Sequence, residues 1–235
     1  MAQRLIRMVE RTAGAIRVRG SVPLSCRGSL TVGRTGDLVA GVDPVDARVS
    51  LRALVVTAAH GGWRIQPENH NGVDLHLWGL PPRRIRHLER VLFEPHVAVR
   101  IVGGEGREYW ALMEGCGKRA LHSEGDMASY TEIADPPPPL THCEEMALRE
   151  VFRDFLAWPP KLRPVPVPLK QVARKFDIST SAIRVRLGGA RDKAEALGFP
   201  QPPSVTRPDF LYGLIQAGYL EFSEEHLDLR LRRSG

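Results

Sequence analysis

The chain has 235 residues, of which 43% are hydrophobic and 26% charged, and it carries a formal net charge of +6. These proportions are close to the globular average, so they exclude a disordered chain and a collagen-like or fibrous one. No apolar run reaches the roughly 18 residues that span a membrane, and the first ten residues lack the apolar core of a secretory signal. Three unevenly spaced cysteines exclude a disulfide framework, so we expect a cytoplasmic protein without membrane partners.

The positive charge is concentrated in one segment. Residues 161–193 contain nine basic and two acidic residues, a net charge of +7, whereas residues 1–135 contain 18 basic and 15 acidic residues. A segment with this balance indicates an acidic partner such as nucleic acid.

Four consecutive prolines, Pro136–Pro139, divide the chain. They have fixed φ angles and no N–H donors, so they continue neither a helix nor a sheet and form a short, stiff spacer. The hydrophobic pattern changes from strand-like to helix-like at this point. We therefore predict a multidomain protein: an all-β domain over residues 1–135, a Pro-rich linker over 136–140 and an all-α domain over 141–235.

Short strands are expected in the first domain. Apolar residues at every second position predict strands over Ala15–Arg19 and Val73–Trp78. Apolar and branched runs predict further strands over Arg52–Thr57, Val97–Val102 and Glu108–Leu112, with a glycine-rich hairpin loop between the last two. Many short strands with turn residues between them are typical of a β-sandwich.

Three segments of this domain carry a family resemblance. Leu30–Val39 (LTVGRTGDLV) is similar to the opening of a forkhead-associated (FHA) domain, and Val49–Leu54 (VSLRAL) is similar to the family's Val-Ser-Arg-x-His segment. Gly62–Val73 is similar to a later strand and its Asn-Gly turn. The resemblance covers about residues 15–113. It implies an eleven-stranded sandwich that binds phosphothreonine peptides through loops at one end.

The resemblance also implies which side chains bind the ligand. A dianionic phosphate is bound by an Arg fork together with neutral donors on short loops. On this basis Arg34 and Ser50 are expected to contact the phosphate, Asn71 to hold the peptide backbone, and Arg52 to be a second phosphate donor.

Two positions depart from the family pattern. Leu51 stands where the family has an arginine, and Ala53 stands where the family has a histidine that supports the loop from inside. Arg52 lies one residue beyond that arginine, and strand geometry directs its side chain to the opposite face. The basic segment Pro81–Arg90 is a candidate loop for binding phosphate or DNA, but we favour its interpretation as a solvated loop.

The second domain is expected to be helical. Thr141 and Glu144 form a capping-box pattern before a helix that extends to about Phe155 and ends at Pro159–Pro160. One face of this helix carries Met146, Leu148, Val151, Phe152 and Phe155. Further helices are predicted at about 168–176, 180–197 (with Gly198 as its stop) and 208–217, followed by a short strand over Tyr219–Phe222.

The segment Leu169–Leu187 has the pattern of a helix-turn-helix. Val172, Ala173 and Phe176 form the inner face of the first helix, Ile178 fills the turn, Ser179 caps the second helix, and Ile183 and Leu187 pack it onto the first. This arrangement is similar to sigma-factor region four and response-regulator output domains. It also resembles actinobacterial-type regulators that append such a module to an FHA domain. Gly188-Gly189 in the second helix either interrupts it or permits a close approach to a backbone.

In a helix-turn-helix the second helix lies in the major groove of double-stranded DNA. Arg184 is the main candidate for base or phosphate contact, because an arginine matches guanine bidentately. The side of the second helix that does not pack against the first carries Thr180, Ser181, Arg184 and Arg186, which are therefore available to contact DNA. Candidate contacts to the DNA backbone are Lys170, Arg174, Lys175, Arg191 and Lys193.

Enzymatic patterns are missing from the sequence. The glycine clusters match neither a phosphate-binding P-loop nor a dinucleotide fingerprint, and no Gly-x-Ser-x-Gly is present. Cys116, His122, His142 and Cys143 lack metal-ligand spacing, so we expect no metal site and no cofactor.

Two functions remain open. We predict a DNA-binding transcriptional regulator that senses a phosphothreonine-containing protein. The alternative is a phospho-dependent signalling adaptor that binds no DNA. The sequence leaves open whether the chain is a homodimer, the state in which a single module of this kind usually binds DNA tightly.

Overall fold

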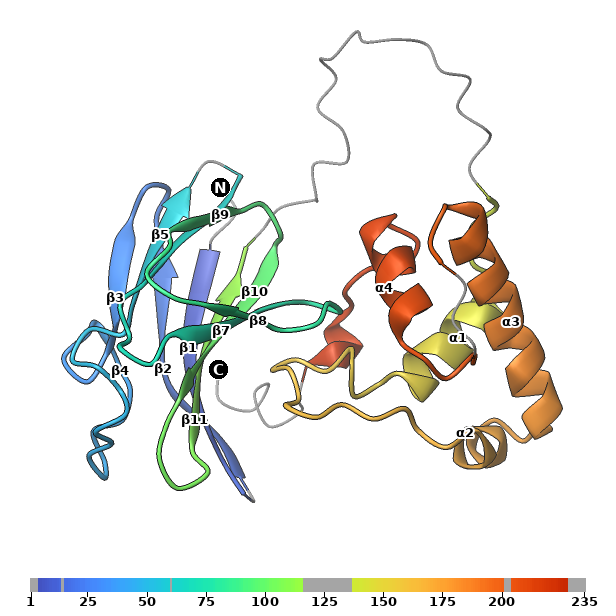
Figure 1. Cartoon of the computed structure of the whole chain (residues 1–235), viewed down its shortest axis with the longest axis horizontal. Coiled ribbons are helices and arrows are strands. Elements are labelled where there is room, and N and C mark those ends of the chain that lie inside the picture. Colours follow the sequence, from blue (N-terminus) through green and yellow to red (C-terminus); the bar gives the residue numbers. More distant parts are fainter. Residues whose placement is uncertain (1–3, 14, 60, 116–136, 201–203, 228–235) are drawn as a thin grey trace, which may run out of the picture. The chain divides into compact units, whose positions relative to one another are not determined.

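The computed structural model describes residues 4–13, 15–59, 61–115, 137–200 and 204–227, and it divides into two compact units (Figure 1). We call the described residues 4–115 the β-sandwich unit and the described residues 137–227 the helical unit. The predicted domain and linker boundaries stay predictions.

The β-sandwich unit has eleven strands within its described residues, the number that the FHA resemblance implies. They are β1 (Arg4–Thr12), β2 (Ala15–Leu24), β3 (Ser29–Gly33), β4 (Leu38–Val39), β5 (Leu54–Ala59), β6 (Gly62–Pro67), β7 (Val73–Leu77), β8 (Arg83–Ile85), β9 (Arg90–Leu92), β10 (His96–Val102) and β11 (Glu108–Glu114). One sheet has the order β2-β1-β11-β10-β7-β8 and the other the order β4-β3-β5-β6-β9.

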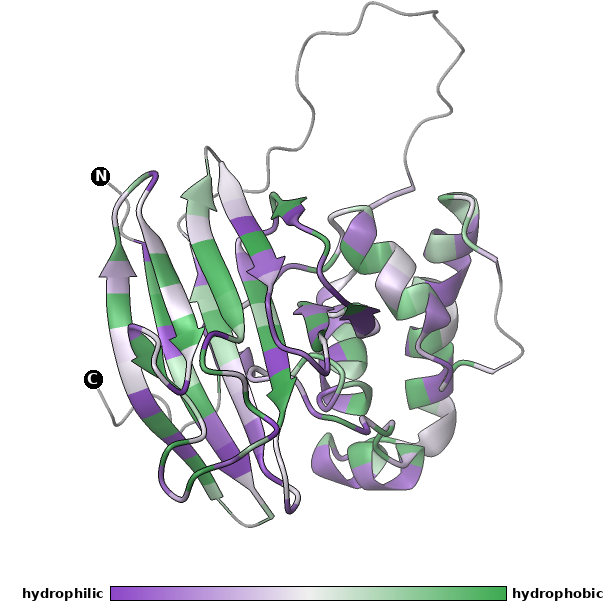
Figure 2. Ribbon diagram, turned by 60° about the vertical axis from the view of Figure 1, so that its left-hand side comes forward, coloured by the Kyte–Doolittle hydropathy of each residue, from purple (hydrophilic) through white to green (hydrophobic). Residues whose placement is uncertain are grey.

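Alternation of side chains along the strands builds the core between the sheets (Figure 2). Strand β5 buries Leu54, Val56 and Ala58, while the residues between them are partly exposed. Trp63 and Ile65 of β6 follow the same rule. Since side chains of successive strand residues point to opposite faces, each strand contributes every second residue to the core.

The five strands expected from the sequence are all formed, with shifted ends. The strand expected over Arg52–Thr57 is displaced to Leu54–Ala59, and Ala15–Arg19 is part of a longer strand that extends to Leu24. Strand β1 was not expected. It lies between β2 and β11, pairing Arg4 with Leu24 and Val9 with Trp110.

The helical unit contains four α-helices in its described part: α1 (His142–Val151), α2 (Leu169–Lys175), α3 (Thr180–Ala196) and α4 (Asp209–Gln216), with a short 3-10 helix η1 (Glu224–His226). Its core includes Leu148, Phe152, Trp158, Ile183, Leu187, Phe210 and Leu214. The rings of Phe152 and Phe210 meet edge to face at a centroid distance of 5.7 Å.

The expected capping box is formed at the start of α1. The Thr141 hydroxyl accepts from the Glu144 N–H at 3.3 Å, and the Glu144 carboxylate accepts from the Thr141 N–H at 2.7 Å. The prediction that this helix reaches Phe155 is wrong, because it ends at Val151. The chain turns at Phe152, whose carbonyl accepts from the N–H groups of both Phe155 and Leu156. The side chains of Phe152 and Leu156 are both buried.

The prediction of a strand over Tyr219–Phe222 is also wrong. Gly218 adopts a left-handed conformation (φ +79°), and the Tyr219 N–H donates to the Leu214 carbonyl at 2.8 Å. This is the closure of a helix end by a glycine. Beyond it the Glu221 carbonyl accepts from the Arg149 guanidinium at 3.1 Å, so this backbone group binds a side chain instead of a neighbouring strand.

Candidate functional site

Three loops meet at one end of the β-sandwich unit. The Arg34 N–H, after β3, donates to the Ser50 carbonyl at 3.2 Å, and Arg34 Nε donates to the Val49 carbonyl at 2.8 Å. Gly33 permits this approach, because a Cβ atom there would lie 2.4 Å from the Leu51 carbonyl oxygen. The structure therefore brings the predicted site residues Arg34 and Ser50 together.

The loop that carries Arg34 is closed by Asp37. Its carboxylate accepts from the Thr31 N–H at 2.7 Å and from the Thr31 hydroxyl at 2.9 Å. These hydrogen bonds hold the pKa of Asp37 below its usual value. Across the described residues no carboxylate pairs with Arg34, so its terminal guanidinium nitrogens remain available to an anion.

Asn69 links the other two loops, and it was not among the site residues predicted from the sequence. Its side chain is 1% exposed, its Oδ1 accepts from the Ser50 N–H at 3.0 Å, and its Nδ2 donates to the Gly72 carbonyl at 3.0 Å. The Ser50 hydroxyl accepts from the His70 N–H at 3.1 Å. The sequence held a signal for it, since Asn is favoured at the first position of a β-turn and Gly72 closes this turn back to Asn69.

Asn71 lies on the surface of the same turn. Its Nδ2 is 3.4 Å from the Arg48 carbonyl, and its own carbonyl accepts from the Arg84 guanidinium. Arg52, in contrast, is 58% exposed and forms an ion pair with Glu68 at 3.3 Å. The three residues Arg34, Ser50 and Asn71 thus share one loop cluster, whereas the guanidinium of Arg52 already has a carboxylate partner.

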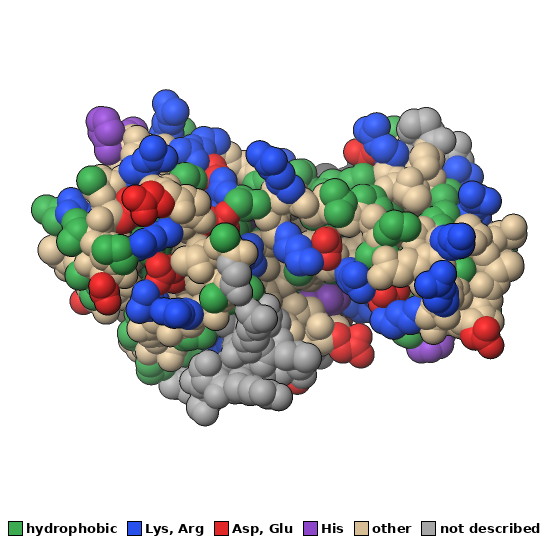
Figure 3. All heavy atoms as spheres, turned by 90° about the horizontal axis from the view of Figure 1, so that it is seen from below, with side chains coloured by type: hydrophobic (Ala, Val, Ile, Leu, Met, Phe, Trp, Pro, Cys, Tyr) green, Lys and Arg blue, Asp and Glu red, His purple; other side chains and the backbone are tan. Residues whose placement is uncertain are grey.

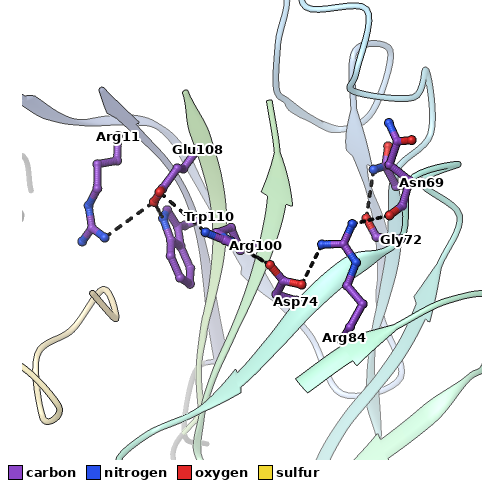
Figure 4. Close-up of polar contacts among 9 residues, drawn as sticks. Arg11, Asn69, Gly72, Asp74, Arg84, Arg100, Glu108 and Trp110 are labelled. Carbon is purple, nitrogen blue, oxygen red and sulfur yellow. Dashed lines mark hydrogen bonds and ion pairs between the residues drawn. The ribbon is translucent and has the colours of Figure 1, made fainter. Parts of the chain in front are cut away.

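A chain of polar contacts supports the turn from the sheet (Figure 4). Arg84, placed by the sequence in a solvated loop, lies on β8 and donates to Asp74 at 2.7 Å. Asp74 also pairs with Arg100, which lies 3.6 Å from Glu108. Burial raises the pKa of Asp74, but Arg84 and Arg100 outweigh that effect and hold this pKa below its usual value.

Four of the six residues expected to pack the helix pair α2–α3 are buried, namely Val172, Ala173, Ile183 and Leu187. Phe176 and Ile178, expected on the inner face and in the turn, are half-buried. The Ser179 hydroxyl caps α3 by accepting from the Ala182 N–H at 3.0 Å. Helix α3 continues through both glycines to Ala196, so they do not interrupt it.

Part of the positive charge of residues 161–193 is neutralised inside the helical unit. Four of the nine basic residues form ion pairs there: Lys161 with Asp154, Lys175 with Glu150, Arg191 with Asp192, and Lys193 with Glu144. Five basic residues have no ion-pair partner within the described part of the chain, and these are Arg163, Lys170, Arg174, Arg184 and Arg186. With Asp177 as the remaining acidic residue, the charge offered to a partner is about +4.

The predicted DNA contacts therefore fall into two groups. Lys170, Arg174, Ser181 and Arg184 are exposed, and Thr180 and Arg186 are half-buried. Lys175, Arg191 and Lys193 are the three with a carboxylate partner. The surface shows the same mixture, with acidic side chains beside several of the Lys and Arg side chains (Figure 3).

The described residues contain no group of three or more His, Cys, Asp and Glu side chains that could hold a metal ion. His142 and Cys143 are exposed, whereas Cys116 and His122 lie outside the described residues. None of the described helices is both long and apolar enough to cross a membrane.

No protein-family model and no curated protein matches the chain. Among solved structures, it is similar to the FHA domain of the CT664 protein from Chlamydia trachomatis, with 19% identity and a TM-score of 0.34 over 47% of this chain and 95% of that one. The FHA-1 domain of Rv1747 from Mycobacterium tuberculosis is 19% identical, with a TM-score of 0.29 over 48% of this chain and 98% of that one. The FHA domain of human APLF, in complex with an XRCC1 bisphospho peptide, is 21% identical, with a TM-score of 0.31 over 46% and 95%. At these identities and TM-scores the similarity identifies no ligand for this chain.

Proposed function

We propose that the β-sandwich unit binds phosphothreonine peptides and that the helical unit binds double-stranded DNA, so that the chain is a phosphorylation-responsive transcriptional regulator. The observation that carries the first part is the loop cluster of Arg34, Ser50 and Asn71. It combines a hydroxyl, an amide and a guanidinium that has no carboxylate partner among the described residues, all at one edge. A charged fork with neutral donors is the chemistry that a phosphate dianion requires.

Binding of a phosphothreonine peptide library to the full chain tests this part. We expect binding that is lost when threonine replaces phosphothreonine, and lost again in Arg34→Ala. Arg52→Ala is the matched control, because Arg52 is already paired with Glu68, and it should reduce affinity no more than about twofold. Equal losses in the two variants, or equal binding of both libraries, would contradict the assignment.

The DNA-binding part is supported by five basic residues that have no ion-pair partner in the described residues, on and around the α2–α3 pair. Release of counterions from DNA gives a slope of log affinity against log salt of about −0.9 for each phosphate contacted. If all five residues contact phosphates, the slope should be about −4.5.

Fluorescence anisotropy of a labelled duplex across a salt series measures this slope. Arg184→Ala should weaken binding and lower the slope by about 0.9 if the contact is to a phosphate. Arg153→Ala is the control, because Arg153 lies outside the helix pair and forms an ion pair with Glu150 at 3.3 Å. Absence of DNA binding at low salt, with phosphopeptide binding intact, would make the signalling adaptor the better description.

A further inference from the structure

Helix α3 exposes an apolar side chain at an unusual place. Val185 is 74% exposed, the largest fraction among the exposed large hydrophobic side chains of the described residues. Single exposed apolar residues are common on protein surfaces. Val185, however, directly follows Arg184, the main candidate for DNA contact.

A second observation on the same helix concerns its two glycines. A Cβ atom at Gly189 would lie 2.4 Å from Glu144 Oε1, so packing against α1 accounts for that glycine. A Cβ atom at Gly188 would have no atom of the described residues within 4 Å. Glycine is among the poorest helix formers, and packing within the described part of the chain gives no reason for one at position 188.

Val185 and Gly188 lie on one face of α3. Together with Ser181 and Arg184 they occupy positions i, i+3, i+4 and i+7, which are neighbours on a helix surface. Ile183 and Leu187 point into the core and are 0% exposed. We call the surface formed by Ser181, Arg184, Val185 and Gly188 the α3 outer face.

The chemistry of the α3 outer face fits the major groove of DNA. The C5-methyl of thymine is the apolar group that base pairs present there, and small aliphatic side chains contact it. A residue without a Cβ atom one turn further along lets the helix backbone come close to its partner. The charge beside it is positive and without an ion-pair partner in the described part of the chain, which favours a polyanion over an apolar protein partner.

We propose that Val185 determines DNA specificity by contacting a thymine methyl group, and that Gly188 provides the close approach that this contact needs. This inference rests on the proposed DNA binding of the helical unit. It adds Val185 to the residues that the sequence pattern singled out, and it assigns Gly188 one of the two roles that the pattern left open.

The test begins with a duplex that the full-length chain selects from a library of random 20-base-pair DNA. Each thymine of that duplex is then replaced by deoxyuridine, which removes one methyl group. We expect one position where this replacement weakens binding about fourfold, the effect of burying one carbon group. Val185→Ala should weaken binding to the thymine duplex to a similar degree.

The combination of the two changes identifies the contact. If Val185 touches that methyl group, deoxyuridine at the same position should have no further effect on Val185→Ala, as in a double-mutant cycle. Val165→Ala is the matched control, because Val165 is a 62% exposed valine outside the helix pair. It should keep the full fourfold response to deoxyuridine.

Gly188→Ala gives an independent readout. The added methyl group should weaken binding to the thymine duplex about tenfold by preventing close approach, with no loss of thermal stability in the free protein.

The outcomes separate the two proposals. If no sequence is enriched from the library, DNA recognition by the helical unit fails and this inference fails with it. If a duplex is enriched but deoxyuridine acts equally on the native chain and on Val185→Ala, DNA binding stands and the Val185 contact is overturned. A change in the association state of the free chain in Val185→Ala, without a change in thymine preference, would assign the α3 outer face to a second copy of the chain.

Discussion

Asn69 joins two loops of the candidate phosphopeptide site through a single buried amide group. The FHA resemblance places the supporting side chain at position 53, where this chain has an alanine that is 0% exposed. The Ala53 carbonyl instead accepts from the N–H groups of Glu68 and Asn69 at 2.9 and 2.8 Å. Support for the Ser50 loop therefore comes from the opposite loop, through backbone and amide groups.

Substitution of Asn69 should damage both stability and binding. Asn69→Ala leaves the Ser50 N–H and the Gly72 carbonyl without their partner inside the protein, which costs about 2 kcal/mol in the free energy of unfolding. Urea unfolding and phosphopeptide titration measure the two effects. Asn71→Ala is the matched control, since its longer contact lies on the surface, and its stability should change by less than about 0.5 kcal/mol. Equal destabilisation by both variants would refute this role of Asn69.

His76 should make the stability of the β-sandwich unit depend on pH. It is 3% exposed, it packs against the Trp110 ring, and burial followed by the charge of Arg100 lowers its pKa to about 4. The unfolded chain therefore binds a proton between pH 6.5 and pH 4 that the folded chain does not bind. Stability from this residue is fully present above pH 6.5 and falls as the pH drops toward 4.

Between pH 7 and pH 5 the expected loss from His76 is about 2 kcal/mol. Urea unfolding at both pH values, compared between the native chain and His76→Phe, measures it. The variant keeps an aromatic ring against Trp110. Between pH 7 and pH 5 its free energy of unfolding should fall by about 2 kcal/mol less than that of the native chain. The same substitution at exposed His70 serves as the control, and an unchanged pH dependence in His76→Phe would contradict the prediction.

Most elements could be predicted from the sequence, because their patterns are local. The strand expected over Val73–Trp78 (formed over Val73–Leu77), the capping box at Thr141 and the cap at Ser179 are all present. Strand β1 was missed because it buries both of its faces, with Ile6 and Met8 on one side and Val9 on the other, so its pattern does not alternate.

Residues that depend on distant partners were harder to predict. Asp74 occupies a position where alternation predicts exposure, yet it is 8% exposed because Arg84 and Arg100 pair with it. The ion pairs of α1 with Lys175 and Lys193 likewise join residues 25 and 49 positions apart. The net charge of +7 counted over residues 161–193 does not take such ion pairs into account. It therefore overestimates the positive charge that this segment offers to a partner.

The two glycines of α3 offer a matched pair for stability. Gly188→Ala adds a methyl group in open space and should stabilise the helical unit by up to about 1 kcal/mol. Gly189→Ala forces the Glu144 carboxylate away from its positions beside Lys193 and the Thr141 N–H, which offsets that gain. Thermal unfolding should show Gly188→Ala to be more stable than Gly189→Ala by about 1–2 kcal/mol in the free energy of unfolding. The reverse order would contradict the role assigned to Glu144.

The whole molecule combines two units with separate cores. Trp63, Ile65 and Ile101 are buried in one, and Phe152, Trp158 and Phe210 in the other. Hydrogen bonds also join distant segments within each unit. Strand β1 pairs with β11 in the β-sandwich unit, and the backbone N–H of Trp158 donates to the His226 carbonyl at 2.8 Å in the helical unit. Communication between a phosphopeptide and DNA would therefore require the intact chain.

Fragments divided after residue 125 test this organisation. We expect each to unfold cooperatively, and the second fragment to bind DNA with an affinity that does not respond to phosphopeptide. In the intact chain the coupling must be reciprocal. If a phosphopeptide changes the affinity for DNA by some factor, DNA must change the affinity for the phosphopeptide by the same factor. Titrations of each ligand with and without the other measure both factors. A first fragment that fails to fold would refute the independence of the units.

The position of β1 between β2 and β11 has a consequence for how the protein is made. Strand β1 has two partner strands. One is β2, and the other is β11, in which the partner residues run from Glu108 to Glu114. A ribosome releases β1 first and β11 last of the eleven strands, so the larger sheet stays incomplete until nearly half of the chain has been synthesised. During that interval β1 presents an unpaired edge, the feature that invites association with other chains. Growth conditions that slow translation of the first 114 residues should therefore favour aggregation of the nascent protein more than a delay in the helical unit.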